Sequence, residues 1–359
     1  MNFKPNCMGT AIGSLPHTTA EKAVDVVLAN IPDAPIWPQL PKLGLREQME
    51  IQYSEGMPAQ VLDEAKGRMY FNTAADSSEA FAQFYESYMT AMDPDSGNGD
   101  CSSMAITPTF SKGIYALENR LKASGKKLPC VKVQTTGPIS FSLTLVDENK
   151  RAIYYNDEFR DMIVKALAMK CRWQIQKFKS FADNIICFVD EPILSAFGSS
   201  TYVSVQRADV VQYLKEMVDA IHTDGAIAGI HCCGNTEWSI PVDAEMDLIN
   251  FDAFQYGDTL GMYPEAMTKH LRRGGILAWG IVPTSAVVRE QTAEGLMAKM
   301  EGLLQGLSTK VGMDTKTILT QSMITPSCGT GSLPEPDAEK VFSLIGQVSR
   351  LFRSRYAFA

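Results

Sequence analysis

The chain has 359 residues, of which 45% are hydrophobic, 21% charged and 9% aromatic, a mixture typical of folded globular proteins with a large core. The net charge is −8 and no run of Lys and Arg exceeds a pair, which argues against nucleic acid or anionic membrane as a partner. No apolar stretch reaches the roughly 18 residues of a membrane span, and residues 1–10 lack the pattern of a signal peptide. We therefore expect a cytoplasmic protein whose eight cysteines are free thiols, metal ligands or core residues.

Short apolar segments alternate with longer segments of helical periodicity, which is typical of βαβ units around a parallel sheet. The predicted strands are residues 8–14, 35–40, 130–135, 184–190, 226–231, 247–252, 275–281 and 317–323. The amphipathic segments predicted to be helices are residues 20–30, 158–181, 206–222, 290–305 and 336–352. Eight strands predict an α/β fold with a single TIM-type (β/α)8 barrel, and we expect residues 1–359 to form one domain.

The segment 41–128 is too long for one connection between strands. We interpret it as an insertion in the barrel that elaborates the segment after the second strand. Within it, Asp93–Asp100 has the sequence DPDSGNGD and predicts an exposed loop, with an exposed Cys101 behind it. Four other cysteines lie in or beside apolar segments and are interpreted as small buried hydrophobes: Cys7, Cys130, Cys171 and Cys187.

Polar side chains gather where the predicted strands end. They include Gly13–Ser14, Gln39, Thr135–Thr136, Asp190–Glu191, His231–Cys233, Asp252 and Thr325–Cys328. Because the carboxyl ends of barrel strands form the active-site face, we expect these segments to meet at one pocket. Trp37 and Trp279 also end strands, where either rim packing or a ligand contact is expected, and His17 is expected in the first loop near the pocket.

His231, Cys232 and Cys233 end the fifth predicted strand, and Cys328 follows the eighth. Side chains alternate along a strand, so His231 and Cys233 face one way and Cys232 the other. One imidazole and two thiolates suit tetrahedral Zn²⁺, and three protein ligands leave a fourth position for a substrate. The alternative is that the cysteines only pack in the core and that the histidine is an ordinary buried polar residue.

An open zinc site with thiolate ligands fits a particular chemistry. A free thiol has a pKa of about 8.5 and is mostly protonated at neutral pH. Coordination to zinc removes the proton and keeps the sulfur nucleophilic. The pattern therefore favours alkyl transfer to a thiol over activation of water, which more often uses histidine and carboxylate ligands.

Taken together, five motifs resemble a known family. The segments Ile12–Pro16 (IGSLP), Thr136–Pro138 (TGP) and Val189–Pro192 (VDEP), with the His and Cys motifs, are similar to the C-terminal catalytic barrel of cobalamin-independent methionine synthase. The His-x-Cys-Gly-Asn motif at His231 also resembles methylcobalamin:coenzyme M methyltransferases and the wider uroporphyrinogen decarboxylase superfamily. The matches occur in the same order over nearly the whole chain.

The resemblance implies roles for individual residues. His231, Cys233 and Cys328 would be the zinc ligands and the centre of catalysis, with Cys232 as a spacer. In substrate binding, Gly13 and Ser14 would contact the amino-acid part of homocysteine, and Asp190 would hold its ammonium group. The alternatives are a turn or helix-capping hydroxyl at Ser14 and a structural ion pair at Asp190. The family's further zinc ligand is a glutamate, at whose position this chain has the shorter Asp252. Apart from the resemblance, Glu55 between Ser54 and Gly56 is a candidate for a second carboxylate in the ammonium pocket.

The resemblance also implies a methyl donor, and here the chain departs from the synthase. It has no second barrel and no basic cluster for a polyglutamate tail, so methylcobalamin, free or on a corrinoid protein, is favoured over methyltetrahydrofolate. The expected product of homocysteine is methionine. The alternatives are a folate-dependent methionine synthase-like enzyme, a coenzyme M-type methyltransferase, a uroporphyrinogen decarboxylase-like protein, and a non-catalytic zinc-binding or corrinoid-protein partner.

Overall fold

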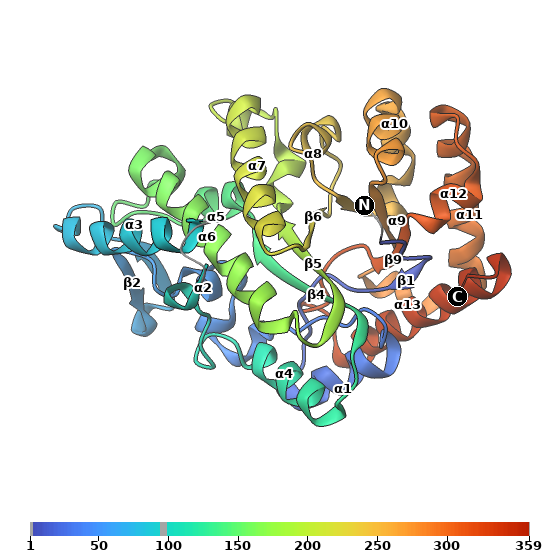
Figure 1. Ribbon diagram of the computed structural model, residues 1–359, viewed down its shortest axis with the longest axis horizontal. Helices are drawn as coiled ribbons and strands as arrows, with labels where there is room; N and C mark the ends of the chain where they lie inside the picture. Colours follow the sequence, from blue (N-terminus) through green and yellow to red (C-terminus); the bar gives the residue numbers. More distant parts are fainter. Residues whose placement is uncertain (1–2, 94–98, 359) are drawn as a thin grey trace.

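The computed structural model of the protein describes residues 3–93 and 99–358. A curled parallel sheet of seven strands forms its centre, in the order β1-β9-β8-β7-β6-β5-β4, and the long helices surround it (Figure 1). The strands are β1 (Met8–Gly9), β4 (Leu128–Thr136), β5 (Ala182–Asp190), β6 (Ile227–Cys232), β7 (Leu248–Phe251), β8 (Ile276–Val282) and β9 (Ser322–Pro326). The α/β class with a parallel sheet is therefore confirmed, as are the predicted strands that correspond to β4 to β8.

The predicted strand 35–40 is not a regular strand, so the expected count of eight is not confirmed. The segment nevertheless lies between the two ends of the sheet and forms isolated parallel bridges. Ile36 pairs with Lys132 of β4, and Gln39 pairs with Ser14 beyond β1. Pro35 and Pro38 lack the N–H groups that a continuous ladder needs, which explains why only single bridges form. The first predicted strand is likewise shortened, from 8–14 to Met8–Gly9.

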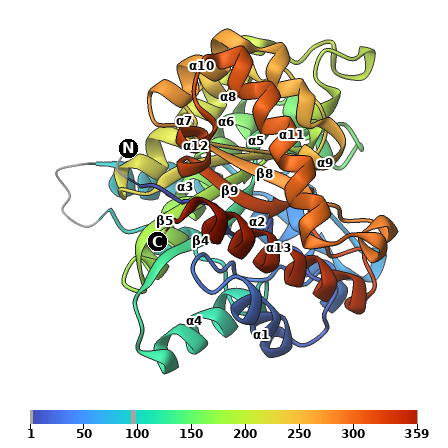
Figure 2. The same cartoon turned by 90° about the vertical axis from the view of Figure 1, so that its right-hand side faces the viewer.

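All five amphipathic segments predicted to be helices are helices. They are α1 (Ala20–Asn30), α6 (Asp157–Phe178), α7 (Arg207–Thr223), α11 (Ala293–Val311) and α13 (Glu335–Tyr356). Helix α1 contacts both α4 (Lys112–Ser124) and α13, so the last helix of the chain packs beside the first (Figure 2). In the described residues, none of the helices combines the length and the apolar character needed to cross a bilayer.

The last predicted strand, 317–323, begins too early. Residues 315–320 form the short helix α12 (Thr315–Thr320), and β9 starts only at Ser322. The helix begins where it does because Asp314 caps it and accepts a hydrogen bond from the Thr317 backbone N–H at 2.9 Å. Ile318 is buried on this helix, so its apolar character came from helix packing rather than from the sheet.

Residues 41–128 contain the small antiparallel pair β2 (Gln60–Asp63) and β3 (Arg68–Phe71) as well as helices α2 (Met49–Ser54), α3 (Ser78–Met92) and α4. The fully buried Lys170 of α6 holds this segment in place, since its ammonium group donates to the carbonyl oxygens of Glu55 at 2.7 Å and Met104 at 3.2 Å. The segment supplies part of the pocket described below.

The expectation of an exposed Cys101 is wrong. The side chain is fully buried, and its thiol donates to the carbonyl oxygen of Gly99 at 3.4 Å. The chain here folds back against α6, where Gln176 also donates to the Gly99 carbonyl at 2.9 Å. Residues 94–98 of the predicted loop Asp93–Asp100 lie outside the described residues.

Candidate functional site

Three potential metal ligands meet at the carboxyl ends of the strands. His231 is the penultimate residue of β6, Cys233 follows that strand directly, and Cys328 lies two residues after β9. One ligand atom from each side chain lies within 4.8 Å of the other two. Cys232 is 1% exposed and faces away, with its thiol 3.6 Å from the carbonyl oxygen of Gly234. The alternation along the strand therefore brings together the two residues that the sequence places on one face.

Asn250 engages one of the two ring nitrogens of His231 and leaves the other facing the cysteines. Nδ1 lies 2.5 Å from the side-chain oxygen of Asn250 on β7, so Nε2 is the nitrogen available to a metal. Burial by itself would lower the pKa of His231, but contacts with Cys233 and then the charge of Asp190 offset it, so the pKa is raised. Asn250 was not found from the sequence, where the only signal was one amide within the apolar strand Leu248–Phe251.

The two thiols influence each other's ionisation. A hydrogen bond from Cys328 and then one from His231 lower the pKa of Cys233 far below its ordinary value. The same contact with Cys233, followed by burial, raises the pKa of Cys328. One thiolate therefore forms easily, whereas a second beside it needs a positive charge to balance it. A divalent cation between the two sulfurs would supply that charge.

A pocket of about 510 Å³ opens next to this cluster. His231, Cys233 and Cys328 form part of its wall. The other lining residues are Ile12, Ser14, Gln39, Pro41, Lys42, Glu47, Gln48, Met49, Asp190, Pro192, Gly329, Gly331 and Ser332. They come from the first strand-to-helix connection, from residue 39, from the 41–128 segment and from the ends of β5, β6 and β9. The expected convergence of strand ends therefore occurs in part: Ser14, Gln39, Asp190, His231, Cys233 and Cys328 line the pocket, whereas Thr135–Thr136, Asp252 and Thr325 are not in its lining.

Asp190 is the most unusual carboxylate of the pocket. It is 2% exposed, and its Oδ1 has no hydrogen-bond partner within the described residues. Burial raises its pKa, although the positive charge of Lys132 and then that of His231 oppose the rise. A buried, unpartnered carboxylate oxygen at a pocket wall is suited to a cationic or hydrogen-bond-donating ligand.

Ser14 lies in the pocket wall and also holds the loop that carries Cys328. Its carbonyl oxygen accepts from the backbone N–H of Thr330 at 2.9 Å, and its hydroxyl oxygen accepts from that of Gly331 at 3.1 Å. Next to it, Gly13 is needed for close packing. A Cβ atom there would lie 2.5 Å from Oε1 of Gln39. The turn at Gly13 and Ser14 thus connects the end of the first strand with residues 35–40 and with the loop that carries Cys328.

Asp252 does not belong to the ligand cluster among the residues that the structure describes. It caps the short helix α9 (Ala253–Tyr256), and its Oδ1 accepts from the backbone N–H of Gln255 at 2.8 Å. Its carboxylate is 3% exposed and close enough to feel the charges of Cys233 and His231. In this conformation Asp252 acts as a helix cap beside the site.

The pocket does contain a second carboxylate, but it is Glu47 and not Glu55. Glu55 is bonded within the 41–128 segment, where its carboxylate accepts from the backbone N–H of Thr107 at 2.8 Å and from the Thr107 hydroxyl at 2.7 Å. Glu47 lines the pocket and accepts from the backbone N–H of Lys112 at 2.9 Å. Nothing in the local sequence of Glu47 distinguishes it, because its position depends on how the 41–128 segment folds over the barrel.

The two tryptophans at strand ends are packing residues. Trp37 is fully buried and donates from Nε1 to the side chain of Gln174 at 2.9 Å. Trp279 is also fully buried, donates to the hydroxyl of Ser322 at 3.0 Å, and packs against Phe251 with ring centroids 5.3 Å apart. Of the two expectations for these residues, packing is therefore the correct one.

The three remaining histidines lie away from the pocket lining. His17 lies 3.5 Å from the carboxylate of Glu339, and His222 lies 2.6 Å from that of Asp247. His270 lies 3.1 Å from the carbonyl oxygen of Ile276. The expectation that His17 faces the pocket is wrong, because its first-loop position turns it towards α13.

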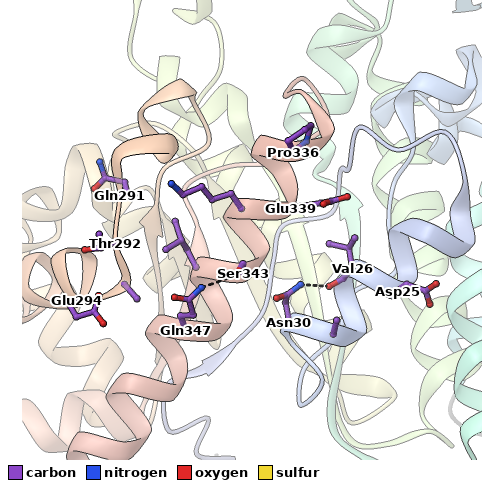
Figure 3. A pocket seen from close by; sticks show the side chains of 14 residues that line it. Asp25, Val26, Asn30, Gln291, Thr292, Glu294, Pro336, Glu339, Ser343 and Gln347 are labelled. Carbon is purple, nitrogen blue, oxygen red and sulfur yellow. Dashed lines mark hydrogen bonds between the residues drawn. The ribbon is translucent and has the colours of Figure 1, made fainter.

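A larger hollow than this pocket lies elsewhere on the molecule. A groove of about 930 Å³ runs between α1, α13 and the start of α11 (Figure 3). Side chains along it bond within their own helices: Asn30 donates to the carbonyl oxygen of Val26 and Gln347 to the hydroxyl of Ser343, each at 2.8 Å (Figure 3). We place the functional site at the smaller pocket, because it holds the ligand cluster and the unpartnered carboxylate.

The sequence matches no protein-family model, and no curated protein matches it. Among solved structures, the fold is similar to that of a B12-independent methionine synthase from Shewanella sp. W3-18-1, determined in complex with selenomethionine. The two chains share 13% sequence identity with a TM-score of 0.45, over 67% of this chain and 68% of that chain.

Proposed function

We propose that the protein is a zinc-dependent methyltransferase that transfers a methyl group to a thiol. The observation that carries the proposal is the cluster of His231, Cys233 and Cys328, whose ligand atoms lie within 4.8 Å of one another beside a pocket. One nitrogen and two sulfurs are a donor set that zinc prefers, and the open side of the cluster leaves room for a substrate sulfur. Zinc bound here would keep that sulfur in its reactive thiolate form.

We propose homocysteine as the acceptor, with methionine as the product. Asp190 would receive the ammonium group on its unpartnered Oδ1, which would orient the acceptor with its sulfur towards the cysteines. Ser14 can still donate its hydroxyl hydrogen, because its oxygen is used only as an acceptor from Gly331. That hydrogen would be directed at the substrate carboxylate. Holding the acceptor at both ends turns the transfer into a reaction between prepositioned groups.

We further propose methylcobalamin, free or on a corrinoid protein, as the donor. A corrin ring with its side groups is too bulky to enter a pocket of about 510 Å³. It would therefore cover the mouth of the pocket and present its methyl group inward. Methyltetrahydrofolate is the other candidate donor. For the fold, we propose that the curled sheet closes as a (β/α)8 barrel in which residues 35–40 take the place of the second strand, and that residues 1–359 form one domain.

The lining of the pocket argues against the uroporphyrinogen decarboxylase alternative. That reaction requires several arginines for the carboxylates of its substrate. The described lining contains one cationic side chain of the Lys or Arg type, Lys42, and two carboxylates, Asp190 and Glu47. A polyanionic substrate would therefore meet a pocket of the wrong charge.

Measurement of bound metal in the purified protein tests the proposal. We expect about one zinc per chain, lost in Cys233→Ser and in Cys328→Ser together with methyl transfer, because a serine hydroxyl stays protonated where a thiolate is needed. The matched control is Cys232→Ser, one residue away but facing the core, which should keep its zinc. Zinc loss in Cys232→Ser with retention in Cys233→Ser would contradict the assigned ligands.

A further inference from the structure

Asn250 is a fully buried amide at the centre of the strands that carry the ligands. It lies on β7, directly beside His231 of β6 in the sheet register. Its side chain makes three hydrogen bonds: Nδ2 donates to the carbonyl oxygen of Ala278 at 2.8 Å and to the hydroxyl oxygen of Thr325 at 2.7 Å, and Oδ1 lies 2.5 Å from Nδ1 of His231. The amide therefore connects four consecutive strands, β6 to β9.

These bonds fix which way the amide points. The backbone carbonyl of Ala278 can only accept, so the NH2 group of Asn250 must be the end that faces β8. The amide oxygen is then left facing His231, and an amide oxygen can only accept. Nδ1 of His231 must therefore carry a hydrogen. In the neutral imidazole the other nitrogen, Nε2, then carries the lone pair.

We propose that Asn250 is a positioning residue that holds His231 in its Nδ1–H form, so that Nε2 is ready to bind zinc. This role rests on the zinc site proposed above. An imidazole with a hydrogen on Nε2 cannot coordinate through that atom, and without a fixed acceptor at Nδ1 the ring can adopt either form and can rotate. Partners of this kind in other metal sites typically contribute about 10- to 100-fold in metal affinity.

The same amide also links the histidine to the strand of the distant cysteine. Thr325, which accepts from Nδ2, lies on β9 three residues before Cys328. The three hydrogen bonds therefore hold the strand of His231 and the strand that leads to Cys328 at a fixed spacing. Because the Asn250 amide is fully buried and all three bonds are internal, it has no water to exchange with, so these bonds hold its orientation.

The first test is the protonation of His231 in the zinc-free wild-type protein. Nitrogen NMR distinguishes the two neutral forms of an imidazole, and the chain has only four histidines to assign. At an alkaline pH, where the ring is neutral, we expect the hydrogen on Nδ1. A hydrogen on Nε2 would overturn the proposal. This measurement needs no variant, so it decides the question even if an altered protein does not fold.

The second test compares variants by zinc affinity, measured in competition with a chromophoric chelator. Asn250→Leu removes the acceptor and should weaken zinc binding about 10- to 100-fold, whereas Asn250→Asp keeps an acceptor for Nδ1 and should bind zinc more tightly than Asn250→Leu. The matched control is Gln174→Leu, which removes another fully buried amide that is hydrogen-bonded to Trp37, away from the site.

Unchanged affinity in Asn250→Leu, or an equal loss in Gln174→Leu, would overturn the role of Asn250, because the effect would then be absent or would only reflect a damaged core. A wild-type protein that binds no zinc would instead refute the proposed function. In that case the NMR result would still show whether Asn250 sets the form of His231, so the two failures are distinguishable.

Discussion

The unpartnered Oδ1 of Asp190 makes a quantitative prediction about the acceptor. Asp190→Asn replaces one carboxylate oxygen by an amide of nearly the same shape and removes the negative charge. Since Asp190 is 2% exposed, water screens little of its interaction with a ligand bound in the pocket. An ammonium group bound to Asp190 would therefore lose a charge-assisted hydrogen bond in the variant.

The size of the effect follows from the type of bond that is lost. A hydrogen bond that involves a charged group contributes about 1.5–3 kcal/mol. At about 1.4 kcal/mol per factor of ten, this corresponds to a loss of roughly 10- to 150-fold in affinity for homocysteine. Zinc content should not change, because Asp190 is not one of the three clustered ligands.

The assay compares two thiols on the two zinc-loaded proteins by calorimetry. Homocysteine and 4-mercaptobutanoate share the thiol, the carbon chain and the carboxylate, but only homocysteine has an ammonium group. We expect Asp190→Asn to weaken homocysteine binding alone. Equal weakening of both thiols would refute the reasoning, since it would mean that the substitution disturbs the pocket in general. No weakening of either would show that the acceptor's ammonium group does not reach Asp190.

Three further predictions concern the donor and the stability of the fold. Methyl transfer to homocysteine, followed by the change in cobalamin absorbance, should be rapid with methylcobalamin and slow with methyltetrahydrofolate; rapid methionine formation from the folate without a corrinoid would contradict the proposed donor. Gly137→Ala should reduce the free energy of unfolding by about 1–3 kcal/mol, because its Cβ would lie 2.2 Å from the buried carboxylate of Glu191. The control Gly302→Ala lies in open space on α11 and should stabilise the protein by up to about 1 kcal/mol. Equal denaturation midpoints for the two variants would contradict this prediction. Burial lowers the pKa of Lys170 to about 7 from its ordinary value of 10.5. Between these two pH values the folded chain binds fewer protons than the unfolded chain, so the free energy of unfolding should rise with pH. In Lys170→Met, denaturation curves over that range should lose this part of the rise with pH, and an unchanged pH dependence would show that Lys170 stays charged.

Much of the architecture could be predicted because it depends on local periodicity. The helical spacing of apolar residues located five helices, and runs of buried apolar residues located β4 to β8. The alternation of side chains along one strand also sufficed to place His231 and Cys233 on one face and Cys232 on the other. Each of these inferences uses only neighbours in the chain, whose geometry the backbone fixes.

Where the prediction was wrong, a local signal had two possible causes. The apolar pair Ile318 and Leu319 fits a strand and a helix equally well, and the Asp314 cap starts a helix at Thr315. The length of 41–128 indicated an insertion but not its course, so neither the burial of Cys101 nor the arrival of Glu47 in the pocket could be foreseen. Residues 35–40 have strand-like composition, yet the prolines limit them to single bridges.

The sequence by itself determined which residues could act as ligands and which way they face on their own strands. Only the tertiary structure decided which groups surround them: Asn250 beside His231, Gly331 on the hydroxyl of Ser14, and an empty hydrogen-bond position on Asp190. The physical reason is that hydrogen bonds between strands depend on sheet register and loop path. Both are set by contacts between segments that lie tens to hundreds of residues apart in the chain. The periodicity of the sequence carries no information about such contacts.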